Sequence, residues 1–194
     1  MADDFLDLPL GELVDVLASE EPPGGGSAAA IVVAMAAGLV AMVARASKDH
    51  WPEAGGAIGQ ADAFRARVVP LVQADAEVYR DALKILRRRE EVAERYRDQT
   101  MRDTLEKAAE IPIKIAEAGC DLASLAALLV ENGNPEVRAD AAVACVLAEG
   151  GTTAAAMLVE TNLGATEGDP RVRHVRTLVA AAAEASERAL AAAE

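Results

Sequence analysis

The amino-acid sequence predicts an all-α fold, an elongated antiparallel bundle of about five to six helices. Alanine, leucine, valine, glutamate and arginine dominate the composition, and aromatic residues make up only 3%. This composition favours helices and disfavours a β-sandwich. Apolar residues recur every three or four positions over long stretches, and segments rich in glycine and proline separate these stretches.

The expected helices follow one another as a single domain, residues 1–194, because no linker or shift in composition divides the chain. The first helix covers about residues 9–18, and the second runs from Ser27, its expected N-cap, to about residue 47. The third covers about residues 58–89, and the fourth about residues 99–131, which Pro112 should kink or split. After a turn at "NGNP", the fifth covers about residues 136–162, and the sixth begins with Pro170 and continues to the C-terminus.

The net charge argues against two classes of partner. A formal charge of −13 and a pI near 4.6 oppose attraction to nucleic acid and to anionic membranes. The uncharged run at residues 28–44 is almost long enough to span a bilayer, but alanine and glycine supply little transfer energy and an acidic segment precedes it. We therefore expect a buried central helix, with neither membrane nor nucleic acid as a partner.

The cysteines and histidines predict no metal site. Cys120 and Cys145 lie in apolar helical contexts, and His50 and His174 are far apart in sequence. This pattern is typical of reduced thiols in a cytoplasmic protein, and its spacing matches no metal-ligand motif.

The length of the helices suggests a homodimer. A helix of about 30 residues is about 45 Å long, which exceeds what a compact monomer of this size needs. Faces rich in small residues, at residues 28–44 and 139–156, allow close helix packing against a second copy. The alternative is a wider monomeric bundle with bent helices.

Asp75 interrupts the apolar stripe of the third helix. The stripe consists of Val68, Leu71, Val72, Asp75, Tyr79, Ala82 and Leu86. A carboxylate on such a stripe loses solvation unless it is paired, protonated or faces a polar cavity. Two interpretations follow: Asp75 forms a buried salt bridge, for example with Lys114, or it is a general acid/base whose pKa is raised by burial.

The segment "GGGS", Gly24 to Ser27, precedes the second helix. Glycines at a helix start allow backbone N–H groups to approach an anionic or carbonyl oxygen of a ligand. The lysine of a phosphate-binding loop is absent and no strand precedes the segment, so neither standard nucleotide motif is present. Close helix crossing explains the glycines equally well.

Three further polar residues are ambiguous from periodicity alone. Lys114 lies on a mostly apolar face near Pro112, Asp140 lies on an alanine-rich helix, and Asn162 ends the fifth helix on the same face as Leu158. An asparagine at a helix end is more often a cap than a ligand contact.

An ordered set of motifs resembles the cyclodeaminase/cyclohydrolase family, which includes the C-terminal domain of formiminotransferase-cyclodeaminase and the methenyltetrahydrofolate cyclohydrolase of the serine cycle. The motifs are "PPGGGSAAA", "ADAEVY" around Asp75, "IPIKIAE" at residues 111–117, "GN" followed by "ADAAVA", and "TNL" at residues 161–163. The resemblance covers nearly the whole chain. It implies an all-helical dimer that converts 5-formiminotetrahydrofolate to 5,10-methenyltetrahydrofolate and ammonia, with no metal and no cofactor beyond the tetrahydrofolate substrate.

The resemblance also assigns roles to residues. Asp75 matches the family's proposed catalytic aspartate, Gly24, Gly25, Gly26 and Ser27 would line the folate pocket, and Lys114, Asp140 and Asn162 would be polar supports. The chain departs from the family pattern at Leu158, where an asparagine is frequent, and after the third helix, where "LRRREEVAERY" replaces an "LPK"-like turn. The alternatives are therefore a methenyltetrahydrofolate cyclohydrolase, an inactive folate-binding dimer, or a bundle with another small-molecule or protein partner.

Overall fold

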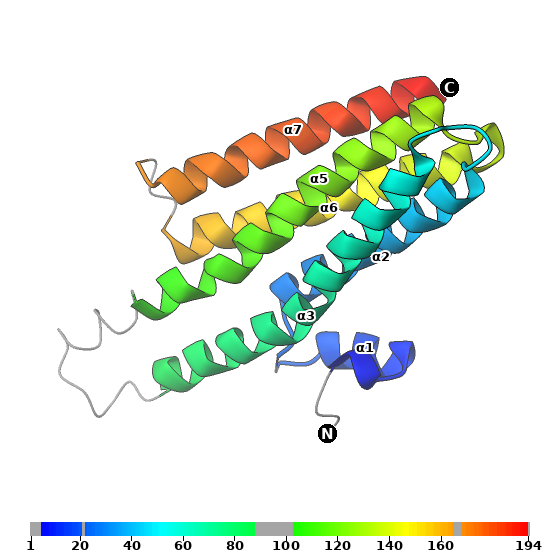
Figure 1. Cartoon of the computed structure of the whole chain (residues 1–194). Helices are drawn as coiled ribbons and strands as arrows, with labels where there is room; N and C mark the ends of the chain where they lie inside the picture. Colours follow the sequence, from blue (N-terminus) through cyan, green and yellow to red (C-terminus); the bar gives the residue numbers. More distant parts are fainter. Residues whose placement is uncertain (1–4, 21, 88–102, 165–167, 194) are drawn as a thin grey trace.

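A computed structural model describes the chain except residues 1–4, 21, 88–102, 165–167 and 194 and the side chains of residues 85–87. The described residues form helices and no strand. In chain order the elements are η1 (Phe5–Asp7), α1 (Leu10–Leu17), α2 (Gly25–Ala46), α3 (Ala54–Arg87), α5 (Glu110–Asn132), η2 (Pro135–Val137), α6 (Arg138–Asn162) and α7 (Pro170–Ala193). The predicted all-α class is confirmed (Figure 1). Pro170 begins the last helix, as expected.

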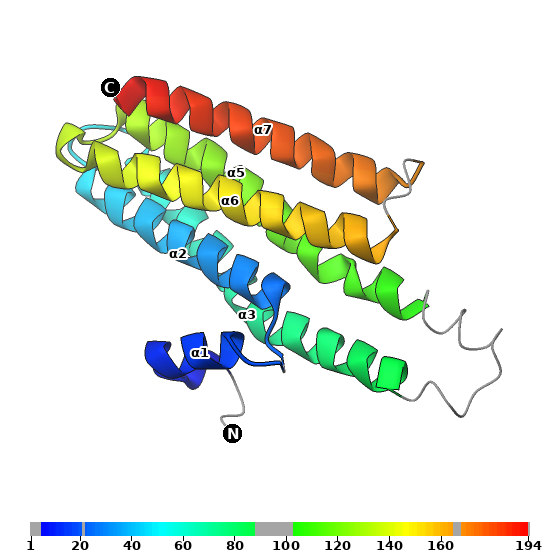
Figure 2. The ribbon, with the colours of Figure 1, turned by 180° about the vertical axis from the view of Figure 1, so that it is seen from behind.

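The long helices lie roughly side by side in an elongated bundle. Helix α2 packs against α3, α5 and α6, and α7 packs against α5 and α6. Figure 2 shows α2 and α6 next to one another on the face seen from behind, with α1 lying beside the bundle, below α2 and α3. Helix α2 is the expected central helix, because Ala30, Val33, Ala37 and Val40 are fully buried.

Small residues bring α2, α5 and α6 unusually close together. A Cβ at Gly151 of α6 would overlap the Val33 side chain of α2, and a Cβ at Gly119 of α5 would overlap the Thr152 hydroxyl of α6. Glycine is required at both crossings because neighbouring atoms fill the space of a side chain. The small-residue faces predicted from the sequence therefore serve contacts within the bundle.

Two proline-containing segments end helices where the sequence predicts a break. Residues 103–108 are helical, Ala109 is a turn, and Pro112 lies in the first turn of α5, where a missing N–H is tolerated. At the opposite end of the bundle, the Asn134 side chain accepts a hydrogen bond from the Glu136 N–H and caps η2. The predicted split and the predicted turn are both confirmed.

Several helices leave apolar side chains exposed. In α1 only Leu13 is buried, whereas Leu10 and Val14 are 73% and 56% exposed. Two helical stretches, Gly25–Ala46 and Pro135–Asn162, are long and apolar enough to cross a membrane by length and composition, with 56% and 50% of their most apolar windows buried. Their exposed halves include Met35 and Met42 of α2 and Val143, Val146 and Met157 of α6.

Candidate functional site

The three glycines at the start of α2 each face a different neighbour. Gly24 is the N-cap of α2 and lies against the Tyr79 ring of α3, 3.9 Å from the position that a Cβ would take. At Gly25 the nearest neighbour of such a Cβ is Leu158 of α6, also at 3.9 Å. At Gly26 a Cβ would overlap the carboxyl group of Asp75. The predicted glycine segment and the predicted catalytic aspartate are therefore in direct contact.

Ser27 connects the start of α2 to α3. Its side chain is fully buried, and its Oγ lies 2.8 Å from the Val72 carbonyl oxygen, to which it donates, and 3.1 Å from Asp75 Oδ2. The sequence predicts Ser27 as the N-cap, and this prediction is wrong: Gly24 occupies the cap, and Ser27 is the third residue of the helix. The Ser27 hydroxyl contacts α3 instead of the free N–H groups of its own helix.

Asp75 is half-buried between α2 and α3. Burial raises the pKa of its carboxyl group; the hydrogen bond from the Ser27 N–H lowers it, and so would any hydrogen bond that the Ser27 hydroxyl donated to it. Lys114 is exposed on α5 and forms no salt bridge with Asp75 among the ion pairs of the described residues. Among the described residues Asp75 therefore takes part in no salt bridge, and it is a half-buried carboxyl group with a raised pKa.

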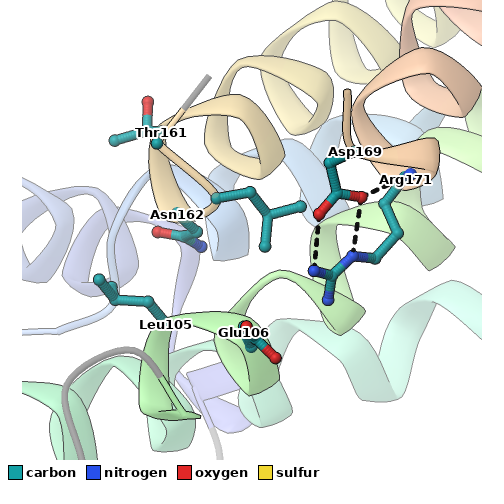
Figure 3. Close-up of a pocket in the computed structure, with 8 residues that line it drawn as sticks. Leu105, Glu106, Thr161, Asn162, Asp169 and Arg171 are labelled. Carbon is teal, nitrogen blue, oxygen red and sulfur yellow. Dashed lines mark hydrogen bonds and ion pairs between the residues drawn. The ribbon is translucent and has the colours of Figure 1, made fainter. Parts of the chain in front are cut away.

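A cavity of about 350 Å³ lies at the end of α6 that approaches the glycine segment. It is lined by Leu105, Glu106, Thr161, Asn162, Leu163, Gly164, Asp169 and Arg171. Asn162 is one helical turn beyond Leu158, which contacts Gly25, so the cavity and Asp75 are at the same end of the bundle. Figure 3 shows Asn162 and Leu105 on one side of the cavity and the Asp169–Arg171 pair on the other.

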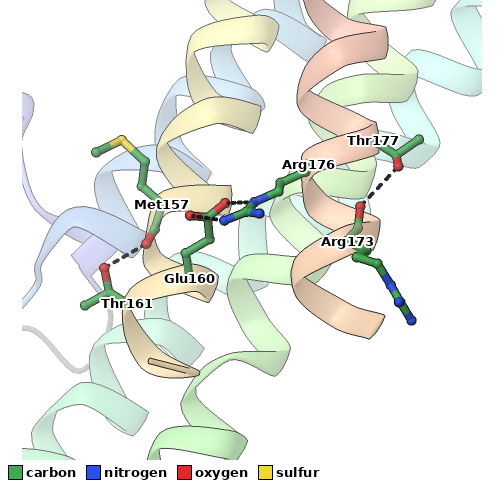
Figure 4. A network of polar contacts seen from close by, with 6 residues as sticks. All are labelled: Met157, Glu160, Thr161, Arg173, Arg176 and Thr177. Atoms are coloured by element: carbon green, nitrogen blue, oxygen red, sulfur yellow. Dashed lines mark hydrogen bonds and ion pairs between the residues drawn. The ribbon is translucent and has the colours of Figure 1, made fainter. Parts of the chain in front are cut away.

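Charged pairs fix the walls of this cavity. Arg171 Nη2 lies 2.8 Å from Asp169 Oδ2, and its Nε lies 3.1 Å from Oδ1, which lowers the pKa of Asp169. Glu160 of α6 pairs with Arg176 of α7, with Nε at 2.8 Å from Oε1, close to Thr161 and Met157 (Figure 4). Because Arg171 is already paired and Glu106 is nearby, the described residues that line the cavity offer no unpaired cation for an anionic ligand.

Comparisons with known proteins agree with this architecture. The family model described as formiminotransferase-cyclodeaminase matches residues 9–182. The chain belongs to the formiminotransferase-cyclodeaminase family. The crystal structure of formiminotetrahydrofolate cyclodeaminase from Thermotoga maritima matches with a TM-score of 0.81 and 22% sequence identity, covering 97% of each chain. At this identity the likeness establishes the fold, and no curated protein matched the chain.

The structure brings together five of the residues assigned from the resemblance to this family: Gly24, Gly25, Gly26, Ser27 and Asp75. Asn162 lies nearby at the end of α6. Lys114 lines a separate hollow of about 380 Å³ together with Arg67, Val68, Leu71 and Glu117. Leu71 is one turn before Asp75 on α3, so this hollow flanks the site.

Asp140 lies at the other end of the molecule. It is exposed in the first turn of α6, and Leu158 is 18 residues later in the same continuous helix. At a rise of 1.5 Å per residue, about 27 Å separate the two positions. Within one chain of this cyclodeaminase-family protein, Asp140 is therefore remote from Asp75.

Sequence reasoning missed one residue of the site. Tyr79 was placed only on the apolar stripe, yet its side chain is 47% exposed and lies against Gly24. Its spacing of four residues from Asp75 is the signal that places it on the same face of α3. Among the described residues, no group of three or more histidine, cysteine, aspartate or glutamate side chains could hold a metal ion.

Proposed function

We propose that the chain is a formiminotetrahydrofolate cyclodeaminase in which Asp75 is the general acid/base. The observation that carries the proposal is the contact of the Asp75 carboxyl group with Gly26 and Ser27 at the start of α2. Family membership supports a folate substrate, and burial, which raises the pKa of Asp75, favours the protonated form that a general acid needs.

The proposed reaction needs one group that gives and takes protons. The Asp75 carboxyl group protonates the formimino nitrogen, and the anilino nitrogen of the substrate attacks the formimino carbon to form a tetrahedral adduct. The Asp75 carboxylate then accepts the proton of the anilino nitrogen and transfers it to the amino nitrogen. The bond between carbon and that nitrogen breaks, ammonia leaves, and the methenyl product forms. Asp75 ends ionised and is protonated again from solvent.

The surroundings of Asp75 suggest how the substrate is held. The first N–H groups of α2 follow Gly24, and they can donate to a carbonyl oxygen at the positive end of the helix. In this proposal the glycine segment forms one wall of the folate pocket, Asn162 supports the wall formed by α6, and Lys114 supports the flank formed by α5.

A kinetic assay tests the proposal. Formation of the methenyl product is followed by absorbance with 5-formiminotetrahydrofolate as substrate. We expect turnover by the wild type and a loss of about 10²- to 10⁴-fold in Asp75→Asn, the range typical of a lost general acid/base. Equal rates for the two proteins, with neither above background, would remove the assignment.

Two alternatives are distinguished by the same material. A cyclohydrolase would consume the methenyl compound by adding water to the same carbon, and Asp75 could serve that step as well. An inactive folate-binding protein is motivated by Leu158, which presents an apolar side chain to Gly25. Calorimetry with a folate analogue separates these cases, because binding without turnover of either substrate favours the inactive protein.

We further propose a cytoplasmic homodimer that pairs through the exposed face of α2 and α6. That face carries Met35, Met42, Val143, Val146 and Met157, and Gly150 leaves open space at the middle of α6. Helix α2 carries a single charged residue, Arg45, near its end, so the α2 part of the face adds little charge repulsion between two copies of a chain with a formal charge of −13. Both cysteines are free and buried, in keeping with a reducing compartment.

This pairing would give Asp140 a role. Asp140 is as far before Gly150 on α6 as Glu160 is after it. An antiparallel contact of α6 with its copy about Gly150 would therefore place the partner subunit's Asp140 beside the end of α6 that carries Leu158 and Asn162. Light scattering should give the mass of a dimer, and Val146→Glu should shift it to that of a monomer. Mixed dimers of Asp75→Asn and Asp140→Asn should recover activity that neither variant has alone.

A further inference from the structure

We propose that Ser27 is a positioning residue that holds Asp75 in its protonated form, accepting a hydrogen bond from the carboxyl O–H while donating its own proton to the Val72 carbonyl. This inference rests on the proposed role of Asp75 as an acid. It concerns a proton whose position can be measured without substrate.

Ser27 Oγ has two acceptor neighbours and only one proton. A serine hydroxyl has one proton to donate and two lone pairs that accept. Ser27 Oγ lies within hydrogen-bond distance of two acceptors, the Val72 carbonyl oxygen and Asp75 Oδ2. If Asp75 were ionised, both neighbours could only accept, and the single proton could satisfy only one of them. If Asp75 is protonated, its O–H supplies the second proton and both contacts become hydrogen bonds.

The two distances point in the same direction. A hydroxyl that donates to a carboxylate typically lies about 2.5–2.7 Å from it, because the acceptor is charged. Ser27 Oγ is 3.1 Å from Asp75 Oδ2 and 2.8 Å from the neutral Val72 carbonyl. The shorter contact is to the weaker acceptor, which is the order expected when the Ser27 proton is already committed to Val72.

The Ser27 N–H completes the arrangement. It donates to the Asp75 carboxyl group, which has one acceptor oxygen even when protonated. The carboxyl group thus accepts from the backbone of α2 and donates to the side chain of the same residue. Both contacts come from Ser27, which is fully buried, so the orientation of the carboxyl group is fixed by one residue.

In the part of the chain that the structure describes, the other charged groups on the helices around Asp75 do not compete for this proton. On α2 the only charged residue is Arg45, at the opposite end of the helix. On α5, Lys114 and Glu117 lie beside Leu71, one turn before Asp75. On α6, Glu160 pairs with Arg176, and on η1 Asp7 is exposed. On α3 itself, Glu77 and Tyr79 are exposed and Arg80 is half-buried.

The test is the direction in which the pKa of Asp75 moves in Ser27→Ala. The Asp75 carboxyl carbon is followed by NMR as the pH is changed, and its resonance is assigned with Asp75→Asn. Because the variant removes an acceptor of the carboxyl proton and keeps the N–H donor, we expect about tenfold weaker proton binding, one pKa unit downward. The matched control is Ser47→Ala, at the other end of α2, which should leave the pKa of Asp75 unchanged.

A rise of the Asp75 pKa in Ser27→Ala, or no change, would overturn the inference, since it would mean that the hydroxyl donates to the carboxylate or does not interact. If Ser27→Ala does not fold, Ser27→Cys gives the same test, because a thiol is a weaker acceptor of similar size and a smaller decrease is expected. Absence of folate turnover by the wild type would reject the proposed function but leave this titration readable. In an active enzyme, the pH profile of kcat should shift downward in parallel with the measured pKa.

Discussion

The two ends of α2 carry two buried serines with almost the same geometry and different consequences. Ser27 and Ser47 are both fully buried, and each donates to a backbone carbonyl at 2.8 Å, Ser27 to Val72 and Ser47 to Val43. Their second partners differ. Ser47 accepts from the Asn134 N–H at 2.9 Å, whereas Ser27 lies 3.1 Å from the carboxyl group of Asp75.

This difference separates a structural end of the helix from a chemical one. The Asn134 N–H is a donor at every pH, so the hydrogen bonds of Ser47 have one fixed direction. The Asp75 carboxyl group is a donor only when it is protonated, so the equivalent arrangement at Ser27 depends on a titration. Ser47 donates one hydrogen bond and accepts another, as a buried hydroxyl requires. Ser27 can do the same only when Asp75 is protonated.

The largest expected effect is that of Gly26→Ala. The added Cβ would overlap the Asp75 carboxyl group, so the carboxyl group or the start of α2 must move. A displacement of about 1 Å in a catalytic group can cost about 10²-fold in rate. We expect at least that loss in kcat, together with lower stability in urea unfolding.

Gly25→Ala is the control for that change. A Cβ at Gly25 would be 3.9 Å from Leu158, an ordinary contact, and alanine has the higher helix propensity. Its free energy of unfolding in urea should remain within about 1 kcal/mol of the wild-type value. If Gly26→Ala were as active and as stable as Gly25→Ala, the close approach of α2 to Asp75 would be needed neither for catalysis nor for stability.

The next effect in size is the loss of stability in Ser47→Ala. This variant removes the hydrogen bond to Val43 and leaves the Asn134 N–H without its partner, which costs about 1–3 kcal/mol for a buried group. Because neither partner titrates, the loss should be the same at every pH at which the protein folds. The measurement is the free energy of unfolding in urea across pH. A loss of stability that varied strongly with pH would show that the hydrogen bonds of Ser47, like those of Ser27, depend on a titrating group.

The sequence predicted the helices well and the tertiary partners poorly. Pro170, Pro112 and the turn before η2 mark helix ends through local backbone chemistry, which a sequence displays directly. Asp75 was identified because a carboxylate interrupts an apolar period. Ser27 was mistaken for a cap because its true partner lies 48 residues away in α3, and a hydroxyl that can cap a helix can equally bond to another helix.

Asp140 shows a limit of a different kind. The resemblance assigned it to the same pocket as Asn162, although both were expected in one helix, at its two ends. The rise of an α-helix already separates such residues by about 33 Å within one chain. Neither periodicity nor resemblance could show the exposed face of α2 and α6, because exposure depends on which elements of the bundle cover each helix.

The smallest expected effect is a difference in the pH dependence of stability between the wild type and Asp75→Asn. The pKa of Asp75 is raised in the folded protein above the ordinary value of 3.8. The folded state therefore binds the proton more tightly than the unfolded state. The stability from this group is fully present below pH 3.8 and is lost as pH rises through the folded-state pKa, by about 1.4 kcal/mol for each unit of difference.

Asp75→Asn should lack this decline, because its carboxamide keeps a donor for Ser27 Oγ at every pH. The remaining titrating groups with shifted pKa values, such as Asp121, Glu160 and Asp169, are present in both proteins and cancel in the difference. The free energies of unfolding of the two proteins should thus diverge as pH rises from the acidic side, with the wild type losing more. If the difference between the two free energies of unfolding stayed constant with pH, Asp75 would have the same proton affinity in the folded and the unfolded chain. Ser27 and Ser47 would then differ only in their positions on α2, and not in the pH dependence of their hydrogen bonds.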